Sequence, residues 1–174
     1  MITAPRLMFH GVTFDPIDLP LANVALVEWG HKMGALHRPN AGDHAYGLTH
    51  NERLVGVVTT SCLCRANVAG HKELTRYNTV ELSRVCAIRK DLCRVLVRLW
   101  REFVFAELPH PFAISYQDAV LHSGDLYRFD GWKRIGKSHS GTDTRSGRKG
   151  RNKVIWGWAK DRDYNWEPME ETNA

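Results

Sequence analysis

Apolar residues recur along the chain with two spacings, and these spacings predict both strands and helices. Runs of β-branched and aromatic residues predict strands, whereas apolar residues three or four positions apart predict helices. The predicted strands are 7–14, 45–50, 53–60, 79–88, 111–118 and 153–159, and the predicted helices are 19–33, 92–108 and 123–131. Asp15-Pro16 is expected to end the first strand, and Pro109 and Pro111 the second long helix. This pattern is typical of an α/β (α+β) fold, with a mixed central sheet flanked by helices.

The length and composition predict a single domain. With 174 residues, the chain is near the usual size for one domain, and it shows no internal repeat. We expect the domain to span residues 1–160, followed by an acidic tail at 161–174. No apolar stretch is long enough to cross a bilayer, and residues 1–10 lack a signal-peptide core, which predicts a cytoplasmic protein without a membrane partner. The four cysteines are expected to be free thiols.

Positive charge is concentrated in one segment near the carboxyl end. The net charge is +5, but residues 133–153 carry eight cations opposed only by Asp143. These cations are Lys133, Arg134, Lys137, Arg145, Arg148, Lys149, Arg151 and Lys153. Interleaved serines and glycines predict a flexible basic loop that attracts phosphate or another acidic partner. The alternative is a solvated loop without a partner.

One connection between a predicted strand and a predicted helix gathers polar side chains. Ser115, Asp118, His122 and Tyr127 lie where the strand at 111–118 ends. In open α/β sheets ligands bind at the carboxyl ends of strands. Asp118 is close enough to orient His122 as a base or as a ligand, although a helix cap and a solvated histidine are the simpler alternative. A regular strand places Ser115 on the same side as Gln117 and on the opposite side from Asp118, so Ser115 and Asp118 can both line one pocket only if the strand end bends.

The same connection resembles the Mom family of phage DNA-modification proteins, a branch of the GNAT acyltransferase superfamily. That family has a Ser-x-x-Asp strand end followed by His-x-Gly-x-x-Tyr and an aromatic residue. Its positions correspond to Ser115, Asp118, His122, Gly124, Tyr127 and Trp132. Further similarities are a His-rich segment at 28–39, a glycine-bearing strand at 53–60 and the sequence Glu81-Leu82-Ser83-Arg84. The resemblance covers residues 28–158 and implies a single GNAT-like domain, which the apolar pattern alone would not select among several α/β arrangements.

The resemblance implies acetyl-CoA or another acyl-CoA as the donor, inserted between the strands at 81–88 and 111–118. Its pyrophosphate would lie at the start of the following helix, where backbone amides and the helix dipole favour anions. The implied cofactor-binding residues are Val85, Cys86, Ala87, Arg89, Lys90, Leu92, Cys93 and Arg94. The superfamily's usual turn there contains glycines, and this turn has none. It is similar to the short polar turn of Mom-like proteins, with Cys93 in place of a serine. We expect Asp91 to cap the helix and Cys93 to be a packed thiol.

The implied catalytic residues are Asp118, His122, Tyr127, Ser115 and His31. A tyrosine at the position of Tyr127 is often the acid toward the CoA sulfur in GNAT enzymes, although Tyr127 could instead pack in the core. His31 best matches the His-rich segment that helps to form the active-site mouth in Mom-like proteins. The use of a metal stays open, because the histidines between 31 and 50 and the Cys62-Leu63-Cys64 sequence match no familiar zinc pattern.

Three functional hypotheses remain. The favoured one, from the resemblance, is an acyl-CoA-dependent enzyme that modifies a nucleobase amine in DNA. We then expect DNA to be a partner whose backbone phosphates contact the basic loop at 133–153. Such an enzyme must reach a base inside a duplex by flipping it out. The second is an acetyl-CoA-dependent N-acetyltransferase acting on a small amine or peptide. The third is a non-catalytic nucleic-acid-binding protein with a GNAT-like fold, which the glycine-free turn would favour. The sequence leaves the oligomeric state open.

Overall fold

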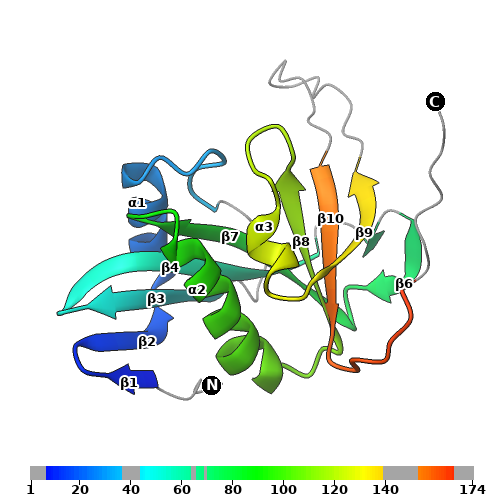
Figure 1. Ribbon diagram of the computed structural model, residues 1–174, viewed down its shortest axis with the longest axis horizontal. Coiled ribbons are helices and arrows are strands. Elements are labelled where there is room, and N and C mark those ends of the chain that lie inside the picture. The colour runs from blue at the N-terminus through cyan, green and yellow to red at the C-terminus, as the bar shows by residue number, and fades with distance from the viewer. Residues whose placement is uncertain (1–6, 37–43, 64–65, 69, 139–152, 167–174) are drawn as a thin grey trace.

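The computed structural model describes residues 7–36, 44–63, 66–68, 70–138 and 153–166. The strands are β1 (Leu7–Phe9), β2 (Val12–Ile17), β3 (His44–His50), β4 (Arg53–Cys62), β5 (Asn67–Val68), β6 (His71–Thr75), β7 (Thr79–Ala87), β8 (Phe112–Asp118), β9 (Lys133–Ser138) and β10 (Lys153–Ala159). The helices are α1 (Leu19–Glu28), α2 (Leu92–Leu99), the π-helix η1 (Trp100–Val104), the 3-10 helix η2 (Phe105–Glu107) and α3 (Asp125–Arg128). Figure 1 shows these elements arranged around one large sheet.

The large sheet has eight strands in the order β1-β2-β3-β4-β7-β8-β10-β9. All neighbouring strands are antiparallel except β7 and β8, which run parallel in the middle of the sheet. Parallel neighbours need a crossover, and here the crossover is the long helical segment formed by α2, η1 and η2. The carboxyl ends of β7 and β8 therefore lie side by side at the same end of these strands, where the connection from β8 to α3 also begins (Figure 1).

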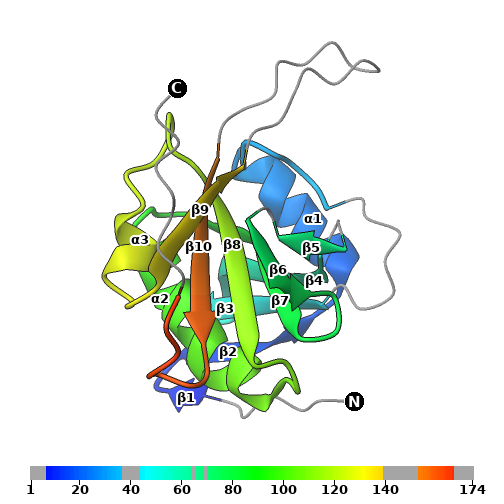
Figure 2. The same ribbon diagram turned by 90° about the vertical axis from the view of Figure 1, so that its right-hand side faces the viewer.

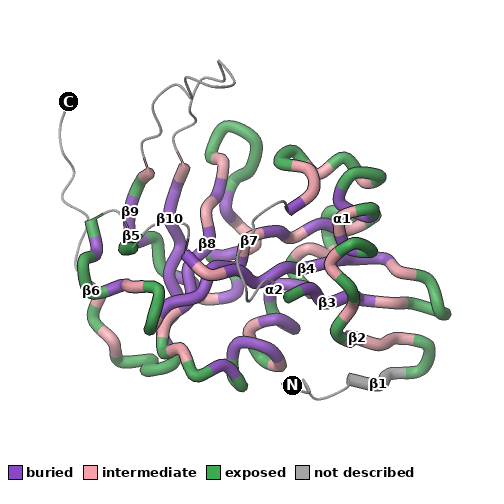
Figure 3. Tube along the Cα trace, turned by 180° about the vertical axis from the view of Figure 1, so that it is seen from behind, coloured by how far each residue is buried: buried purple, intermediate pink, exposed green. Residues whose placement is uncertain are grey.

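Helices cover both faces of this sheet. Successive residues of a strand point to opposite faces, so Val57 and Val58 of β4 enter different apolar clusters. Val58 packs with Leu96 and Trp100 of the long helical segment, whereas Val57 packs with Leu26 of α1. The two views of Figures 1 and 2 accordingly show α1 and α2 on opposite sides of the sheet. In Figure 3 the central strands are the most continuously buried part of the tube, with β4 buried from Val55 to Ser61.

A small two-stranded sheet, formed by β5 and β6, covers the face of β8, β10 and β9 that α2 and α3 leave free. It interrupts the path from β4 to β7. Its apolar side chains pack against the large sheet in one buried cluster, which contains Leu63, Val68, Leu74, Ile114, Ile135 and Ile155. The buried ring of His71 adds a polar link, because its Nε2 donates to the Ile135 carbonyl at 2.7 Å and its Nδ1 lies 3.0 Å from Glu73.

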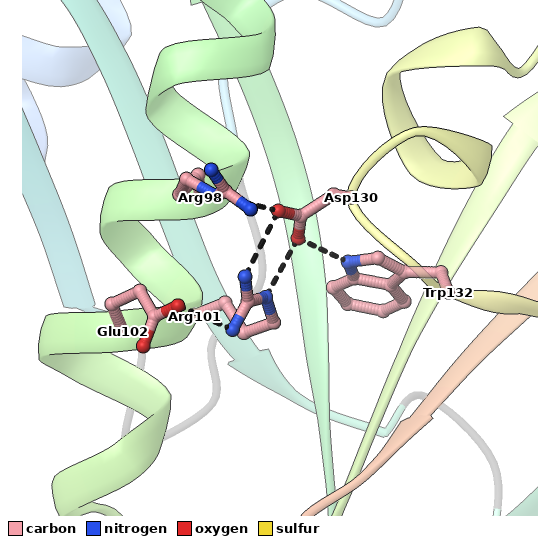
Figure 4. A network of polar contacts seen from close by, with 5 residues as sticks. All are labelled: Arg98, Arg101, Glu102, Asp130 and Trp132. Carbon is pink, nitrogen blue, oxygen red and sulfur yellow. Dashed lines mark hydrogen bonds and ion pairs between the residues drawn. The ribbon is translucent and has the colours of Figure 1, made fainter.

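A buried carboxylate joins the long helical segment to the chain after α3. The Asp130 carboxylate accepts hydrogen bonds from Nε and Nη2 of Arg101, at 2.8 and 3.1 Å, and from the indole N–H of Trp132 at 3.0 Å (Figure 4). Arg98 lies 3.4 Å from the same carboxylate. The Arg101 guanidinium also lies 4.2 Å from the ring centre of Trp158 on β10. Because both partners are nearly buried, this pair fixes how α3 packs against the long helical segment.

Several sequence expectations about the elements are wrong. The first expected strand is a hairpin of β1 and β2, and Asp15-Pro16 lies inside β2 rather than ending it. Among the described residues β1 pairs with β2 only as far as Phe14, so the β1–β2 ladder does not reach Pro16. The first helix ends at Glu28, and the expected helix at 123–131 is only Asp125–Arg128. The start of the expected basic loop is the strand β9, and the β5–β6 hairpin was not expected.

No helix in the described ranges has the length and apolarity needed to cross a membrane. Among the cysteines of the same ranges, Cys62, Cys86 and Cys93 are free thiols, as the composition predicts.

Candidate functional site at the parting of β7 and β8

The two parallel strands separate at the centre of the sheet. Their pairing consists of Thr79 with Phe112, Val80 with Ala113 and Glu81 with Ile114, and it ends there. β7 nevertheless continues to Ala87 and β8 to Asp118. A register shift opposite Thr59 and Thr60 of β4 leaves Ser83 of β7 as an extra residue, and such bulges bend the strand that carries them. The result is a fork whose two arms are Leu82–Ala87 and Ser115–Asp118.

A chain of hydroxyl groups lies at the base of the fork. Ser115 Oγ donates to the Leu82 carbonyl at 2.8 Å, and the phenol oxygen of Tyr127 lies 2.8 Å from the same Oγ. A serine hydroxyl has one proton, so Tyr127 is the donor toward Ser115. The phenol on α3 is therefore connected through Ser115 to the backbone of β7. Ser115 is thus in direct contact with the residue predicted to be the acid.

Tyr127 is held in place by aromatic rings. Its ring stacks on Trp156 with centroids 5.6 Å apart and meets Trp132 edge-on at 5.6 Å. Burial raises the pKa of Tyr127 to about 12, and the charges of Cys93 and Glu81 raise it further while the Ser115 hydrogen bond lowers it. The phenol therefore keeps its proton throughout the neutral range and can donate it to a base formed inside the fork.

The connection from β8 to α3 is fastened by Gln117. Its Oε1 accepts the indole N–H of Trp156 at 2.6 Å, and its Nε2 donates to the backbone carbonyl of His122 at 2.5 Å. Gly124 then turns the chain into α3 with φ of 81°, and a Cβ there would lie 2.5 Å from Gln117 Oε1 and 2.8 Å from Trp156. Ser115 and Gln117 thus share one face of β8, as the strand alternation predicts.

Asp118 and His122 occupy the turn itself. Asp118 Oδ1 accepts the N–H of Val120 at 3.1 Å, and the Asp118 carbonyl accepts the N–H of His122 at 3.0 Å. The carboxylate of Asp118 therefore shapes the turn, in agreement with the simpler alternative for this residue. The His122 side chain is exposed at the open end of the fork. That Asp118, His122 and Tyr127 act as one catalytic unit stays a prediction.

The segment after α1 brings His31 to the same end of the fork. Burial lowers the pKa of His31 to about 4, and the charges of Arg84 and His122 lower it further. The ring is therefore neutral at pH 7. Met33 N–H approaches His31 Nδ1 at 3.3 Å, so the ring proton resides on Nε2, which can donate a hydrogen bond to a bound molecule.

Arg84 of β7 lies near His31 at this end of the fork. It is 6% exposed, and its Nη1 donates to the Ser83 carbonyl at 2.8 Å. On the other side Lys153 Nζ lies 3.9 Å from the sulfur of Met33, which connects β10 with the segment after α1. The described charged residues at this end of the fork thus include the cations Arg84 and Lys153 and the carboxylate of Asp118, which lies opposite Lys153.

The turn between β7 and α2 carries the residues predicted to hold pyrophosphate. Asp91 stands at the N-cap position but makes no side-chain cap hydrogen bond, so the expected cap is wrong. Its carboxylate instead accepts from Arg89, with Oδ1 3.1 Å from Nε. The first amides of α2 also have partners. Leu92 N donates to the Arg89 carbonyl and Cys93 N to the Lys90 carbonyl, both at 3.2 Å. Only part of this turn is available to an anion.

The other predicted cofactor residues lie along the β7 arm and the start of α2. Val85 and Ala87 pack toward α2, whereas Cys86 packs in the cluster beneath α1. Burial raises the pKa of the Cys86 thiol. Burial also raises the pKa of Cys93 to about 11, and the charges of Cys86 and Asp91 contribute to this increase. Cys93 is therefore a packed thiol, as predicted, and not a ready nucleophile.

Half of the predicted DNA-binding residues can be placed. Lys133, Arg134 and Lys137 are exposed on the edge strand β9, and Lys153 begins β10 opposite Asp118. Lys137 and Lys153 lie at the end of the sheet that carries the open fork, whereas Lys133 lies at the other end of β9. Arg145, Arg148, Lys149 and Arg151 lie outside the described residues.

The sequence did not assign Gln117 or Arg84 to the site. The alternation of β8 already placed Gln117 beside Ser115, which was the available signal. Arg84 could have been noticed as a charged residue inside an otherwise buried strand. No group of histidine, cysteine and acidic side chains able to hold a metal occurs in the ranges that the structure describes.

Comparison with known proteins gives similarity in structure but not in sequence. No family model and no curated protein sequence matches the chain. A protein of Chromobacterium violaceum described as an acetyltransferase of the GNAT family superposes with a TM-score of 0.55 at 15% identity, over 90% of this chain and 94% of its own. Arabidopsis thaliana NAA60 in complex with acetyl-CoA gives 0.59 at 13% identity, over 86% and 98%. The chain has the GNAT fold.

A third structure extends the range of similar proteins. Spermidine N-acetyltransferase from Vibrio cholerae gives a TM-score of 0.58 at 11% identity, over 92% of this chain and all of its own. The GNAT fold confirms the predicted α/β (α+β) class, with a mixed sheet flanked by helices. At these identities the similarity establishes the fold alone. The resemblance to Mom-like proteins stays a prediction.

The fork between β7 and β8 fits the pantetheine part of an acyl-CoA better than the turn before α2 fits its pyrophosphate. The fork offers a β7 arm that pairs with β4 on one side and no longer with β8 on the other, for the amides of a pantetheine chain, and a phenol near its base for the sulfur. The glycine-free turn before α2, with two amides already bonded, fits a pyrophosphate poorly.

Proposed function

We propose that the chain is an acyl-CoA-dependent N-acyltransferase that works at the fork between β7 and β8. The observation that carries this proposal is the end of strand pairing at Glu81 and Ile114 directly beside the linked hydroxyls of Ser115 and Tyr127. An extended chain with amide groups could pair with the β7 arm on the side that no longer pairs with β8, and a thiolate would find a proton donor in Tyr127. Similar structures that are named as acetyltransferases, one of them with acetyl-CoA bound, support this choice.

The bound thioester supplies an activated acyl group, and the residues of this chain manage the protons. In the reaction the acceptor nitrogen forms a bond with the thioester carbon, the bond between this carbon and sulfur breaks, and the nitrogen loses a proton. Tyr127 gives its proton to the departing sulfur, after turning its O–H away from Ser115. The exposed His122 receives the proton from the acceptor nitrogen. Neutral His31 donates from Nε2 and orients the acceptor.

We propose further that the acceptor is a nucleobase amine in DNA. The open end of the fork is bordered by Arg84, His31 and His122, so it favours an uncharged amine carried by an anionic molecule over an alkylammonium. The exposed cations of β9 extend this basic character along the edge of the sheet. Phosphate contacts of this kind supply affinity with little sequence preference.

Two measurements test these proposals separately. The first is titration of acetyl-CoA into the protein by calorimetry, for which we expect saturable binding. The second is mass analysis of nucleosides from DNA incubated with protein and acetyl-CoA, for which we expect a base heavier by one acetyl group. Absence of any acyl-CoA binding contradicts the acyltransferase. Acyl transfer to spermidine or to a peptide amine, with DNA unmodified, contradicts only the acceptor.

The role of β9 in DNA binding can be tested by charge removal. We expect Lys133→Ala with Lys137→Ala to weaken binding and to reduce the slope of log affinity against log salt by about 2, since each lost phosphate contact contributes about 0.9. Arg53→Ala is the control, because it removes an exposed charge at the turn between β3 and β4. An unchanged slope in the double variant would remove β9 from the interface.

A further inference from the structure

A hollow that combines cations with aromatic rings lies at the end of the sheet opposite the open fork. β10 ends at Ala159, and residues 160–166 then lie against the start of β9, in the lower part of Figure 1. The side chains that line the hollow include the cations Lys133 and Arg162 and the aromatic residues Trp158, Tyr164 and Trp166. We call this site the Arg162 hollow. It shares no residue with the two arms of the fork.

Arg162 covers the ring of Trp158 at the floor of this hollow. Its guanidinium lies 3.8 Å from the ring centre, and the guanidinium of Arg101, which the buried Asp130 holds in place, lies 4.2 Å from the ring centre of the same tryptophan. Gly131 leaves room for this arrangement, because a Cβ there would lie 3.3 Å from Trp158 and 3.7 Å from Arg162 Nη2. Arg162 itself is exposed, so a further planar group can pack on its guanidinium.

The charges of Arg162 and Lys133 are available to an anion. Both side chains are exposed, and neither forms an ion pair with an acidic side chain in the part of the chain that the structure describes. Asp161 also lines the hollow, and its Oδ1 accepts the N–H of Asp163 at 3.0 Å. Two cations against one carboxylate leave the lining with a net positive charge, which attracts phosphate.

The aromatic walls of the hollow add what the basic segment lacks. Residues 133–153 contain no phenylalanine, tyrosine or tryptophan, so that segment alone offers charge without a stacking surface. Tyr164 and Trp166 come from the residues expected to form an acidic tail, and both are partly exposed. Their rings meet edge-on with centroids 4.9 Å apart, and Trp166 packs against Gly157, where a Cβ would lie 2.8 Å from its ring. The segment after β10 therefore contributes fixed aromatic walls.

β9 connects the hollow with the open end of the fork. Lys133 is the first residue of β9, whereas Lys137 precedes Ser138, which pairs with Lys153 near the fork. The six residues of β9 span about 17 Å at about 3.3 Å per residue. This length corresponds to about five nucleotides at the spacing of about 3.4 Å along one strand of a duplex. A DNA strand whose phosphates follow the cations of β9 away from the fork therefore reaches the hollow.

The chemistry of the hollow fits an unstacked nucleotide. Bases of single strands stack on aromatic rings and on guanidinium groups, whereas neighbouring base pairs cover their faces in a duplex. Arg162 above Trp158 offers such a surface, and Lys133 lines the same hollow and can contact the phosphate. An organic cation, which aromatic pockets can also hold, is disfavoured by the charges of Arg162 and Lys133.

We propose that the Arg162 hollow binds an unstacked nucleotide of the DNA substrate, several nucleotides away from the reacting base. The base packs against Arg162 and the aromatic walls, and its phosphate contacts Lys133. This rests on the proposed DNA acceptor. It adds a stacking site for a single strand to the phosphate contacts of β9, and it places that site in the segment after β10.

Binding of two single strands, measured by fluorescence anisotropy without acyl-CoA, separates stacking from charge. One strand is oligothymidylate, whose base carries no amino group, and the other has the same length and backbone but no bases. We expect the wild type to bind oligothymidylate about 10-fold more tightly than the base-free strand, the size of one stacked base. Arg162→Lys keeps the charge and removes the planar group, so it should abolish most of this preference and leave the affinity for the base-free strand unchanged.

Two further variants complete the test. Arg162→Gln should also weaken binding of the base-free strand and reduce its salt slope by about 0.7, the contribution of one phosphate contact in a single strand. Arg53→Lys is the matched control, because it exchanges an exposed guanidinium at the turn between β3 and β4 for an ammonium. We expect Arg53→Lys to keep the preference of the wild type for oligothymidylate.

The outcomes separate the hollow from the DNA acceptor. Equal affinity of the wild type for the two strands overturns the hollow, and so does an unchanged preference in Arg162→Lys, even if DNA is acetylated at the fork. A preference that Arg162→Lys abolishes, together with DNA that stays unmodified by acetyl-CoA, supports the hollow as a nucleic-acid site and contradicts the acceptor. Absence of binding by both strands overturns the hollow and the DNA acceptor together.

Discussion

The Tyr127 phenol combines two properties that a proton donor needs, which are a retained proton and a fixed position. The position comes from Ser115 and the stacked Trp156, and the retained proton comes from burial. The same burial has a consequence for stability. Because burial raises the pKa of Tyr127 above its unfolded value, the folded protein keeps a proton that the unfolded chain loses above pH 10. The free energy of unfolding therefore falls as the pH rises from 10 toward 12.

Tyr127→Phe separates the two properties. We expect the ring to keep its stacking on Trp156, so unfolding should lose only about 1 kcal/mol, the net value of one hydrogen bond. The rate of acyl transfer should fall by about 100-fold or more, which is the usual contribution of a general acid. Acyl-transfer assays measure the rate, and urea unfolding of the same sample measures the free energy of unfolding. A large loss of stability with unchanged transfer would show that the phenol has only a packing role.

His31 predicts a pH dependence of stability in the acidic range. Its folded pKa of about 4 lies below the unfolded value of 6.5, so between these values the unfolded chain binds a proton that the folded protein does not. The free energy of unfolding should therefore fall as the pH decreases from 6.5 to 4. His31→Gln should reduce this fall, as measured by urea unfolding at pH 7 and pH 5. His10→Gln, at an exposed turn, is the control, and an identical pH profile for His31→Gln would contradict the burial of the ring.

At the scale of elements, the connection from β8 to α3 decides whether the fork is formed correctly. Gln117 fastens it to Trp156 and to the His122 carbonyl, and Gly124 allows the turn that brings Tyr127 inward. The connection therefore depends on one left-handed residue packed against two side chains. A larger residue at Gly124 would displace Gln117 and Trp156, and with them Tyr127, which stacks on Trp156.

Gly124→Ala tests this dependence against Gly30→Ala. Both glycines have positive φ, 81° and 68°, but a Cβ at Gly30 meets nothing within 4 Å. We expect Gly30→Ala to cost about 1 kcal/mol from the backbone alone. Gly124→Ala should cost about 1–3 kcal/mol more from overpacking and should lower acyl transfer as well. Thermal melting and transfer assays provide the readout, and equal costs for the two variants would contradict the packing around Gly124.

The elements also show what the sequence can and cannot predict. The apolar spacing of α2 and β8 predicted both elements, and the alternation of β8 predicted that Ser115 and Gln117 share a face. The fork itself was expected only through the family resemblance, because the separation of β7 from β8 depends on pairing between distant segments. A glycine inside a predicted strand indicates a bulge or a close approach, and Gly56 has both: the register with β3 shifts beside it, and Leu96 of α2 packs against it. The strand β9 was missed because its basic residues and Gly136 resemble a loop, although an edge strand tolerates them.

At the scale of the whole molecule, the β5–β6 hairpin closes the face of the sheet below β8 and β10. Short strands with two to five residues carry little alternation, so the sequence did not predict them. The hairpin nevertheless buries Leu74 completely against Ile114 and Ile155. It therefore supports β8, which is one arm of the fork, from the face opposite Tyr127.

Leu74→Ala tests how much the hairpin stabilises the molecule. A fully buried leucine replaced by alanine usually costs about 2–5 kcal/mol, and we expect a value in this range from urea unfolding. Leu21→Ala on the exposed face of α1, where the side chain is 50% exposed, should cost under about 1 kcal/mol and serves as the control. CoA affinity of the folded Leu74→Ala protein should stay close to wild type. A negligible cost would show that the hairpin is not part of the cooperative core.

The π-helical turn at Trp100–Val104 affects how this chain must be aligned with others of its fold. A π turn closes its hydrogen bond over five residues instead of four, so it holds one residue more than the α-helical turn it replaces. In a pairwise alignment with a protein whose helix is uninterrupted, this surplus appears as a one-residue gap. If the gap is placed outside Trp100–Val104, Arg101 is matched with the wrong helix position. Homologues that retain the Arg101–Asp130 pair would then be overlooked.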